Sequence, residues 1–195
     1  MTDTIGKMAF LYPVFLDLDG VAVLLVGGGQ IASRKAEGLV AAGARLTVVA
    51  PMVLPELAAT AADVRERGYE ADDLVGHQLV ITATDVPAVN AEVAADARAA
   101  GIWVNSADDP ENCSFILPAI ARRGPLIAAL STGGASPALA GRLRDQIAAS
   151  VLTPQAEAAA IDLARQRAEI HAAGGSTELV DWTDRVTDAL DAGAD

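Results

Sequence analysis

The sequence predicts an α/β protein built on a doubly wound parallel sheet. Three observations predict it: short runs of valine and leucine typical of strands buried on both faces, segments of helical periodicity between these runs, and a glycine-rich turn directly after the first run. Strands and helices that alternate in this order form a parallel sheet through right-handed crossovers. We expect that sheet to lie within residues 1–112.

The elements of the sheet follow one another along the chain. Residues 21–26 form the first apolar run, and glycines follow at once. A helix is predicted from Ile31 to Ala42, because its apolar residues recur at helical spacing and Gly43 is placed to end it. The same criteria predict the remaining elements of the sheet: strands at 46–50, 79–83 and 102–105, and a helix at 86–100.

The pattern changes after residue 112. Around the turn Arg122-Arg-Gly-Pro125 we expect short strands, and after them only helices. These later elements are strands at 115–120 and 126–130 and helices at 136–149, 153–172 and 176–190. The chain therefore divides into a sheet domain at 1–112, a segment at 113–150 and a helical C-terminal tail at 151–195.

Composition limits the function classes. A single cysteine, Cys113, excludes an internal disulfide and fits a reducing compartment, so we expect a cytoplasmic protein. No apolar run approaches the roughly 20 residues that span a bilayer. A net charge of −12 disfavours nucleic acid and anionic membranes as partners. Residues 113–150 nevertheless carry four bases and one acid, which would suit a small polyanion, a subunit contact or an ordinary solvated face.

The glycine turn carries the clearest chemical signal. Gly27-Gly28-Gly29-Gln30-Ile31-Ala32 matches G-x-G-x-x-A between a predicted strand and a predicted helix. In this motif the first glycine permits the sharp turn, the second lets a pyrophosphate approach the backbone, and the small last residue lets the helix lie close to the strand. The free N–H groups of the helix then face the phosphates. We predict a Rossmann-type dinucleotide site; the alternative is a glycine-rich turn without a ligand.

The end of the second strand bears on which dinucleotide binds. A carboxylate that holds the ribose hydroxyls is usual there, but the sequence reads Val49-Ala50-Pro51-Met52. We therefore expect backbone and apolar contacts to the adenosine. No Lys or Arg occurs between Arg45 and Arg65 to bind a 2′-phosphate, which favours NAD over NADP.

Polar residues follow the later strands, at Thr82-Ala-Thr84-Asp85 and Asn105-Ser-Ala-Asp108-Asp109-Pro110. The carboxyl ends of parallel strands face one crevice, so these residues are expected beside the glycine turn. Asp85 is interpreted as the N-cap of the next helix, and Asp109-Pro110 as a turn. Asp108 is the better candidate for a catalytic base.

A second glycine-containing segment, Ser131-Thr132-Gly133-Gly134-Ala-Ser136-Pro137, follows a strand and opens a helix. Ser136 has the place of an N-cap, and Pro137 that of the first helical residue. The glycines and hydroxyls would also form an anion-binding nest, with arginines on either side in sequence. The two interpretations are compatible, because helix N-termini bind anions.

The remaining reactive residues predict no further chemistry. His77 and His171 are isolated, and no Cys or His pair has the spacing of a structural zinc site, so no protein-bound metal is expected. His77 is interpreted as a solvated loop residue. Cys113 has no His or Lys within four residues and is interpreted as a buried or incidental thiol.

Several motifs in order resemble one family, the precorrin-2 dehydrogenases, which form the dehydrogenase module of siroheme synthase; some members are also sirohydrochlorin ferrochelatases. The resemblance covers residues 11–150. Its motifs are Tyr12-Pro-Val-Phe-Leu-Asp-Leu18, Val26-Gly-Gly-Gly-Gln-Ile-Ala-Ser-Arg-Lys35, Ala42-Gly-Ala-Arg-Leu-Thr-Val-Val-Ala-Pro51, Ala83-Thr-Asp85, Val104-Asn105 with Asp108, Phe115-Ile-Leu-Pro118 and Ser131-Thr-Gly-Gly-Ala-Ser-Pro137.

The resemblance implies NAD-dependent oxidation of precorrin-2, a tetrapyrrole, to sirohydrochlorin in siroheme biosynthesis, and in bifunctional members the insertion of ferrous iron. It places the catalytic aspartate at Asp108. It also implies a homodimer in which the region after the Rossmann domain is exchanged, so that 113–150 becomes a dimerisation and substrate-contact segment. The resemblance implies Gln30, Ile31, Pro51 and Met52 as cofactor residues, which join Gly27, Gly28, Gly29 and Thr84 from the motif and strand-end arguments. It places Ser131, Thr132, Gly133, Gly134 and Ser136 on the substrate side, and Arg123 is expected there as one of the neighbouring arginines.

Two alternatives stand beside this hypothesis. A non-catalytic NAD(H)-sensing module would bind the dinucleotide without turnover, with the tail contacting a regulatory partner. A dehydrogenase for a small hydroxy acid would often use a histidine base, and neither histidine is well placed for that role. Residues 151–195 match the family weakly.

Overall fold

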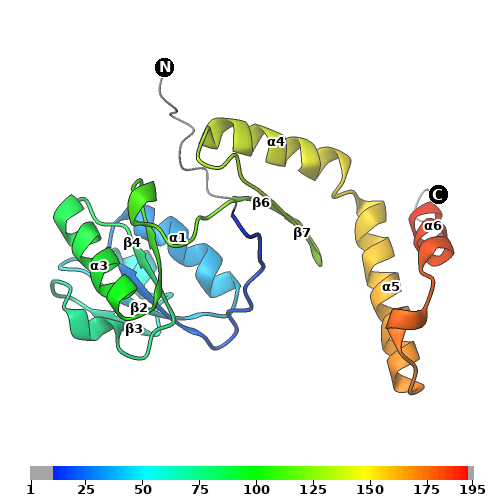
Figure 1. Ribbon diagram of the computed structural model, residues 1–195, viewed down its shortest axis with the longest axis horizontal. Helices are drawn as coiled ribbons and strands as arrows, with labels where there is room; N and C mark the ends of the chain where they lie inside the picture. Colours follow the sequence, from blue (N-terminus) through cyan, green and yellow to red (C-terminus); the bar gives the residue numbers. More distant parts are fainter. Residues whose placement is uncertain (1–10, 193–195) are drawn as a thin grey trace. The chain divides into compact units, whose positions relative to one another are not determined.

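The structure of the chain is a computed structural model that describes residues 11–192. It divides into two compact units (Figure 1). One unit covers Tyr12–Leu117, and the other contains Pro118 and the residues after it.

The first unit contains a five-stranded sheet in which all neighbouring strands run parallel. The strand order is β3-β2-β1-β4-β5, so the order reverses between β1 and β4. The predicted doubly wound parallel sheet is confirmed. Its strands are β1 (Ala22–Val26), β2 (Arg45–Val49), β3 (Asp63–Arg65), β4 (Leu79–Thr82) and β5 (Trp103–Ser106).

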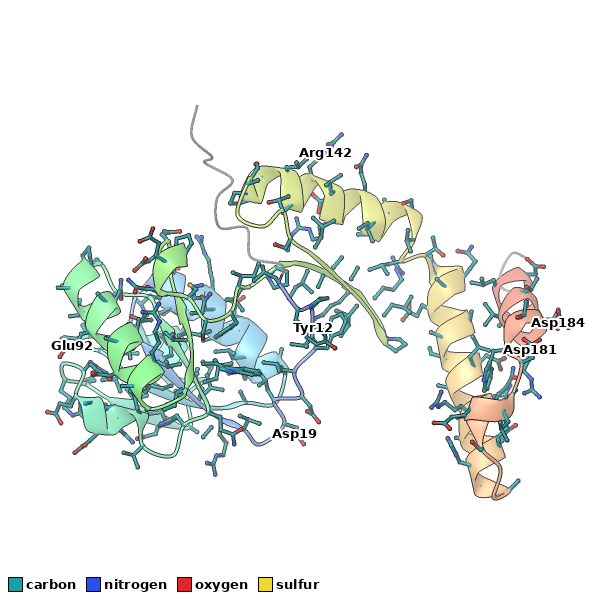
Figure 2. All side chains as sticks on the ribbon, in the orientation of Figure 1. Tyr12, Asp19, Glu92, Arg142, Asp181 and Asp184 are labelled. Atoms are coloured by element: carbon teal, nitrogen blue, oxygen red, sulfur yellow. The ribbon has the colours of Figure 1, made fainter. Side chains whose placement is uncertain are left out.

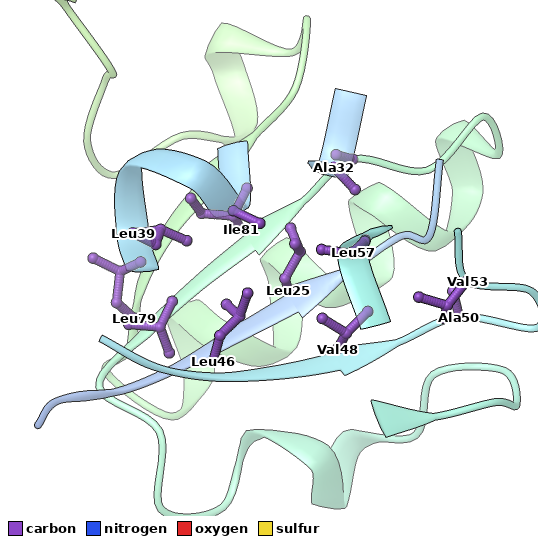
Figure 3. Close-up of a cluster of buried hydrophobic side chains, with 13 residues drawn as sticks. Leu25, Ala32, Leu39, Leu46, Val48, Ala50, Val53, Leu57, Leu79 and Ile81 are labelled. Atoms are coloured by element: carbon purple, nitrogen blue, oxygen red, sulfur yellow. The ribbon is translucent and has the colours of Figure 1, made fainter. Parts of the chain in front are cut away.

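Two long helices cover opposite faces of this sheet, α1 (Gln30–Ala41) and α3 (Pro87–Ala99). Alternate residues of β1 point to opposite faces, as the pleat requires. Val23 and Leu25 join the core beneath α1, which Figure 3 shows, whereas Leu24 and Val26 join the core beneath α3. Because both faces are covered, β1 reads as a continuous apolar run.

The segment between β2 and β4 was not assigned from the sequence. It forms the short helix α2 (Pro55–Ala58), the edge strand β3 and the 3-10 helix η1 (Ala71–Leu74). Asp73 fixes this edge, because its buried carboxylate accepts hydrogen bonds from Arg65 at 2.6 Å and from Arg67 at 2.6 and 2.7 Å. Burial alone would raise the pKa of Asp73, but the hydrogen bonds from Arg67, the Glu70 backbone and Arg65 hold that pKa well below its usual range.

The second unit combines a β-hairpin with helices. The antiparallel strands β6 (Ala119–Arg123) and β7 (Leu126–Leu130) form the hairpin, and α4 (Pro137–Ser150) packs on it. Helix α5 (Pro154–Ala172) packs against α6 (Thr183–Asp191), and the 3-10 helix η3 (Thr177–Leu179) precedes α6. In the described part of the chain, no helix has both the length and the apolar character needed to cross a bilayer.

Two sequence-based elements of this region are wrong. The strand predicted at 115–120 begins at Ala119 and continues through Arg123, so the turn narrows to Gly124-Pro125. The helix predicted at 176–190 is interrupted after Leu179. The interruption has a local cause: Trp182 donates its ring N–H to the carbonyl of Thr177 at 3.2 Å, and α6 begins beyond it.

Candidate functional site

The loops that follow β1, β2, β4 and β5 meet at the carboxyl edge of the sheet. The strand order reverses between β1 and β4, and open α/β sheets bind ligands at such a point. The glycine turn, Met52, Thr84 and Asp108 all lie in these loops.

Gly27 and Gly28 are packed against the backbones of two neighbouring loops. Gly27 has φ +131°, and a Cβ there would lie 2.5 Å from the carbonyl oxygen of Ala83. A Cβ on Gly28 would lie 1.9 Å from the carbonyl oxygen of Met52. The absence of side chains at these two positions therefore lets the loops after β2 and β4 close around the turn.

Gly29 differs from its two neighbours. It is the N-cap of α1 with extended backbone, and a Cβ there would meet no atom within 4 Å. The open space lies where the first turn of α1 presents the backbone N–H groups of Gln30 and Ile31, and that turn carries no acidic residue. Ala32 is fully buried against the sheet. This arrangement fits the pyrophosphate of a dinucleotide, because nothing fills the space and the helix dipole favours an anion.

The loop after β2 offers apolar surface and no acid. Met52 is 82% exposed, and Ile31 at the start of α1 is 51% exposed. Both side chains are therefore available to contact a ligand. The register of β2 and β3 brings Arg65 beside Val49, at the end of β2. That guanidinium is bound by Asp73 and Asp63. The Arg65 guanidinium, which the register places beside the end of β2, is therefore already ion-paired and is not free to bind a 2′-phosphate. This agrees with NAD rather than NADP.

Asn90, on α3, is a site residue that the sequence analysis missed. Its buried carboxamide oxygen accepts hydrogen bonds from the hydroxyls of Thr82 at 2.5 Å and Thr84 at 2.8 Å, and its nitrogen donates to the carbonyl of Thr84 at 3.0 Å. These bonds fix the loop after β4 where it packs against Gly27. An asparagine in the first turn of the helix that follows Thr82-Ala-Thr84 was a signal in the sequence that could have indicated this contact.

The predicted N-cap role of Asp85 is wrong. The N-cap of α3 is Val86, which makes no side-chain cap, and Asp85 is exposed. The hydroxyl of Thr84 accepts the N–H of Val86 at 3.2 Å instead. This bond spans two residues and stabilises the turn that leads into α3, but it does not cap the helix.

Asp108 lies in the loop of residues 106–115, which we call the Asp108 loop. Within residues 11–192 it is the one non-glycine residue with positive φ, at +57°. Its side chain is exposed. The loop returns to the sheet, where the Ser114 N–H donates to the Val104 carbonyl at 2.8 Å and the Val104 N–H to the Ser114 hydroxyl at 2.7 Å. A left-handed aspartate at the tip of a well-anchored loop is typical of a functional position.

Cys113 is the centre of this loop, so the thiol is structural rather than incidental. Its sulfur accepts the N–H of Ser106 at 3.2 Å and lies 3.3 Å from the carbonyl oxygens of Ser106 and Asp109. Burial raises the pKa of the Cys113 thiol. A neutral, half-buried thiol is a poor nucleophile, in agreement with the sequence analysis.

The segment from Ser131 to Ser136 lies in the second unit and is held by its own hydroxyls. The Ser131 hydroxyl accepts the N–H of Gly133 at 3.0 Å, and the Thr132 hydroxyl accepts that of Ser136 at 3.0 Å. The predicted N-cap is confirmed, because the Ser136 hydroxyl accepts the N–H of Leu139 at 3.1 Å. Gly133 and Gly134 both have positive φ, a conformation that glycine adopts without steric cost.

Arg123 does not join this segment within one chain. The hairpin register pairs Arg123 with Leu126 beside the turn, whereas Leu130, which precedes Ser131, pairs with Ala119 at the other end. Its guanidinium lies 3.6 Å from the carboxylate of Glu157 on α5. Figure 2 shows another basic residue of the predicted positive region, Arg142, projecting from α4.

Neither histidine lies in these loops. His77 is half-buried at the opposite edge of the sheet, before β4, and its Nδ1 is buried without a hydrogen-bond partner, so the prediction of a solvated histidine is wrong. Burial lowers the pKa of His77. His171 is exposed in the last turn of α5. Among residues 11–192 no group of three or more His, Cys, Asp or Glu side chains is placed to hold a metal ion.

Two family models match the chain. One, described as "Putative NAD(P)-binding", matches residues 14–119, more than half of the 195 residues. The other, described as "Sirohaem biosynthesis protein central", matches residues 123–150.

Two siroheme synthases are about 50% identical to the chain over the matched residues. Siroheme synthase of Pseudomonas putida (strain W619) is 49% identical over 153 residues, which are 76% of this chain and 33% of the relative. Siroheme synthase 1 of Aeromonas salmonicida (strain A449) is 50% identical over 147 residues, which are 73% of this chain and 31% of the relative. The chain thus spans about a third of the length of these relatives. The solved structure of SirC, a precorrin-2 dehydrogenase, matches with a TM-score of 0.71 and 30% identity over 94% of this chain and 99% of its own.

Proposed function

Since the chain belongs to the NAD(P)-binding family that includes siroheme synthase and precorrin-2 dehydrogenase, we propose that it oxidises precorrin-2 to sirohydrochlorin with NAD, in siroheme biosynthesis. The observation that carries the proposal is the meeting of two features at one edge of the sheet: the open cradle at Gly29 and the exposed carboxylate of Asp108. A dinucleotide site without a nearby base would support only binding.

The first task of the chain is to hold the cofactor. The backbone N–H groups of Gln30 and Ile31 bind the pyrophosphate over Gly29, and Ile31 and Met52 offer apolar surface to the adenosine. The loop of Thr84, fixed by Asn90, closes the other side of the turn. Bound NAD supplies a hydride acceptor.

The second task is to take up a proton. Oxidation of precorrin-2 removes a hydride and a proton, which together account for the two hydrogens lost. Asp108 accepts the proton on its carboxylate, and water can then remove it because the side chain is exposed. The substrate carries many carboxylates, and the Ser131–Gly134 segment with Ser136, at the N-terminus of α4, is proposed to bind one of them.

Replacement of Asp108 by asparagine tests this role. The variant should lose precorrin-2 oxidation by about a hundredfold or more in anaerobic assays followed by absorbance, while calorimetry shows unchanged NAD affinity. Asp85→Asn is the matched control, because Asp85 is an exposed carboxylate in a neighbouring loop. Retained turnover in Asp108→Asn would remove Asp108 from the mechanism. Tight NADH binding by the wild-type chain without any turnover would favour the NAD(H)-sensing module.

The same assay has an iron arm. Insertion of ferrous iron into sirohydrochlorin displaces pyrrole protons, and Asp108 is the base proposed to receive them. Ferrous iron enters here as a substrate. Formation of siroheme above the uncatalysed rate, lost in Asp108→Asn, would establish ferrochelatase activity in this chain; no increase would limit it to the dehydrogenase reaction.

We propose a homodimer formed through the hairpin, in the cytoplasm, where the free thiol of Cys113 stays reduced. Helix α4 covers one face of the hairpin, and Ile120 and Ile127 remain exposed on the other. A two-stranded ribbon with open edges is marginal alone, and a second copy would cover both the edges and the apolar face. Ile127→Asp should convert dimer to monomer in light scattering, whereas the control Ile161→Asp, an exposed isoleucine on α5, should not. A monomeric wild type at micromolar concentration would contradict the proposal.

A further inference from the structure

Lys35 lies on α1, and its side chain reaches Asn105 near the end of β5. It is one of two lysines in the chain, and its side chain is half-buried. The same helix presents Gln30 and Ile31 at the cofactor cradle, about 7 Å away along the helix axis at 1.5 Å per residue. A half-buried lysine at this distance from a cofactor site requires an explanation, because a lysine on a helix surface is ordinarily solvated.

The ammonium of Lys35 binds a side chain that leads to the Asp108 loop. Its Nζ donates to the carboxamide oxygen of Asn105 at 3.2 Å, a contact between residues 70 positions apart. Asn105 is the third residue of β5 and is 6% exposed. Its carboxamide nitrogen donates to the carbonyl of Phe115 at 3.0 Å and lies 3.6 Å from the sulfur of Cys113.

These contacts join both ends of the Asp108 loop to α1. Phe115 is the last residue of the loop, and Cys113 binds the N–H of Ser106 at its beginning. Because Lys35 fixes which end of the Asn105 carboxamide faces α1, the nitrogen is left facing the loop, where it can donate. The Phe115 carbonyl, which can only accept, favours the same orientation, so the ammonium and this carbonyl hold the carboxamide from its two ends.

Electrostatics agree with this position. Burial lowers the pKa of Lys35, while the charge of Asp108 acts in the opposite direction. The ammonium therefore lies within the electrostatic range of Asp108, although Asn105 is its hydrogen-bond partner.

We propose that Lys35 is a positioning residue: its ammonium orients the Asn105 carboxamide, and Asn105 holds the loop that presents Asp108 at the cofactor crevice. The proposal rests on the proposed function only for its catalytic consequence, because the link between α1 and the loop exists without turnover. Lys35 is not assigned any contact with substrate or cofactor.

Lys35→Met tests the link, with Arg34→Met as the matched control, since Arg34 is the neighbouring cation on α1 and is exposed. Hydrogen exchange at the amides of Ser106 and Ser114, which bind Cys113 and Val104 respectively, should become about tenfold faster in Lys35→Met and stay unchanged in Arg34→Met. Lys35→Arg, which keeps a donor at this place, should restore most of the protection. This measurement needs neither cofactor nor substrate.

Kinetics give the second readout. Lys35→Met should lower kcat for precorrin-2 oxidation about tenfold or more, with the Kd for NAD within twofold of the wild-type value. Unchanged exchange in a folded Lys35→Met protein would overturn the proposal. It would also be overturned by a raised KM for precorrin-2 with unchanged kcat and exchange, which would make Lys35 a substrate ligand. Faster exchange in a chain that never oxidises precorrin-2 would support the link and refute the proposed function instead.

Discussion

Alanine substitutions at two adjacent glycines should separate folding from cofactor binding. A methyl group on Gly28 would lie 1.9 Å from the Met52 carbonyl oxygen and 2.9 Å from the Cα of Val53. Reaching an ordinary contact of about 3.5 Å would require the loop after β2 to move by about 1.5 Å. Overpacking of this kind costs about 1–3 kcal/mol, which for a chain of this size lowers Tm by about 2–12 °C.

Gly29→Ala should behave in the opposite way. A methyl group there meets no atom within 4 Å, and φ is −92°, which alanine adopts readily. The loss of stability should be below about 1 kcal/mol, as for other substitutions at N-caps without a side-chain bond. The methyl group would nevertheless occupy the space in front of the helix N-terminus. We expect the Kd for NAD to rise at least tenfold, or about 1.4 kcal/mol.

Differential scanning calorimetry and titration calorimetry measure the two effects on the same samples. Gly28→Ala should lower Tm, and Gly29→Ala should lower NAD affinity with nearly unchanged Tm. If Gly29→Ala bound NAD as tightly as the wild type, the pyrophosphate would not lie over Gly29, and the cradle would be wrongly placed.

Two further outcomes follow from buried polar groups. Asp73→Asn should reduce the free energy of unfolding by about 3 kcal/mol at pH 7 in urea titrations, because two guanidinium groups lose their buried partner. In the wild type the depressed pKa of Asp73 gives stability that is present above about pH 4 and is lost as the pH falls further; the mutant should lack this part of the acid transition, and identical acid profiles would contradict the assignment. Asn90→Leu should cost about 2 kcal/mol, because the hydroxyl of Thr82 loses its partner, and it should also weaken NAD binding as the loop of Thr84 loosens; a destabilised variant with wild-type Kd would show that this loop does not contribute to the cofactor site.

The sheet and its glycine turn were predictable because local residue chemistry determines them. Buried parallel strands must be apolar on both faces, and the place of Gly27 to Gly29 between a strand and a helix leaves few other structures. Strand β3 escaped notice because Asp63 and Arg65 flank a single valine, and the strand is held by Asp73 rather than by an apolar face. The capping error at Asp85 arose because α3 begins at Pro87, so that Val86, and not Asp85, occupies the N-cap position.

The site was predictable in part. The residues expected in the loops of the first unit do lie at one edge of its sheet, because parallel strands bring their ends together. The contacts that hold those loops were not predictable: Lys35 and Asn105 are 70 residues apart, and no periodicity joins them. Likewise, Arg123 was grouped with Ser131 because they are near in sequence, but the hairpin register separates them and gives Arg123 to Glu157.

The backbone at Asp108 has a consequence for how this position can change. Glycine adopts a φ of +57° without steric penalty, whereas a residue with a Cβ gives up about 1 kcal/mol there, somewhat less for aspartate and asparagine. If only folding mattered, glycine would be the better occupant. The substitution that most improves this loop as a turn is therefore one that deletes the base, so stability and chemistry make opposing demands on a single residue.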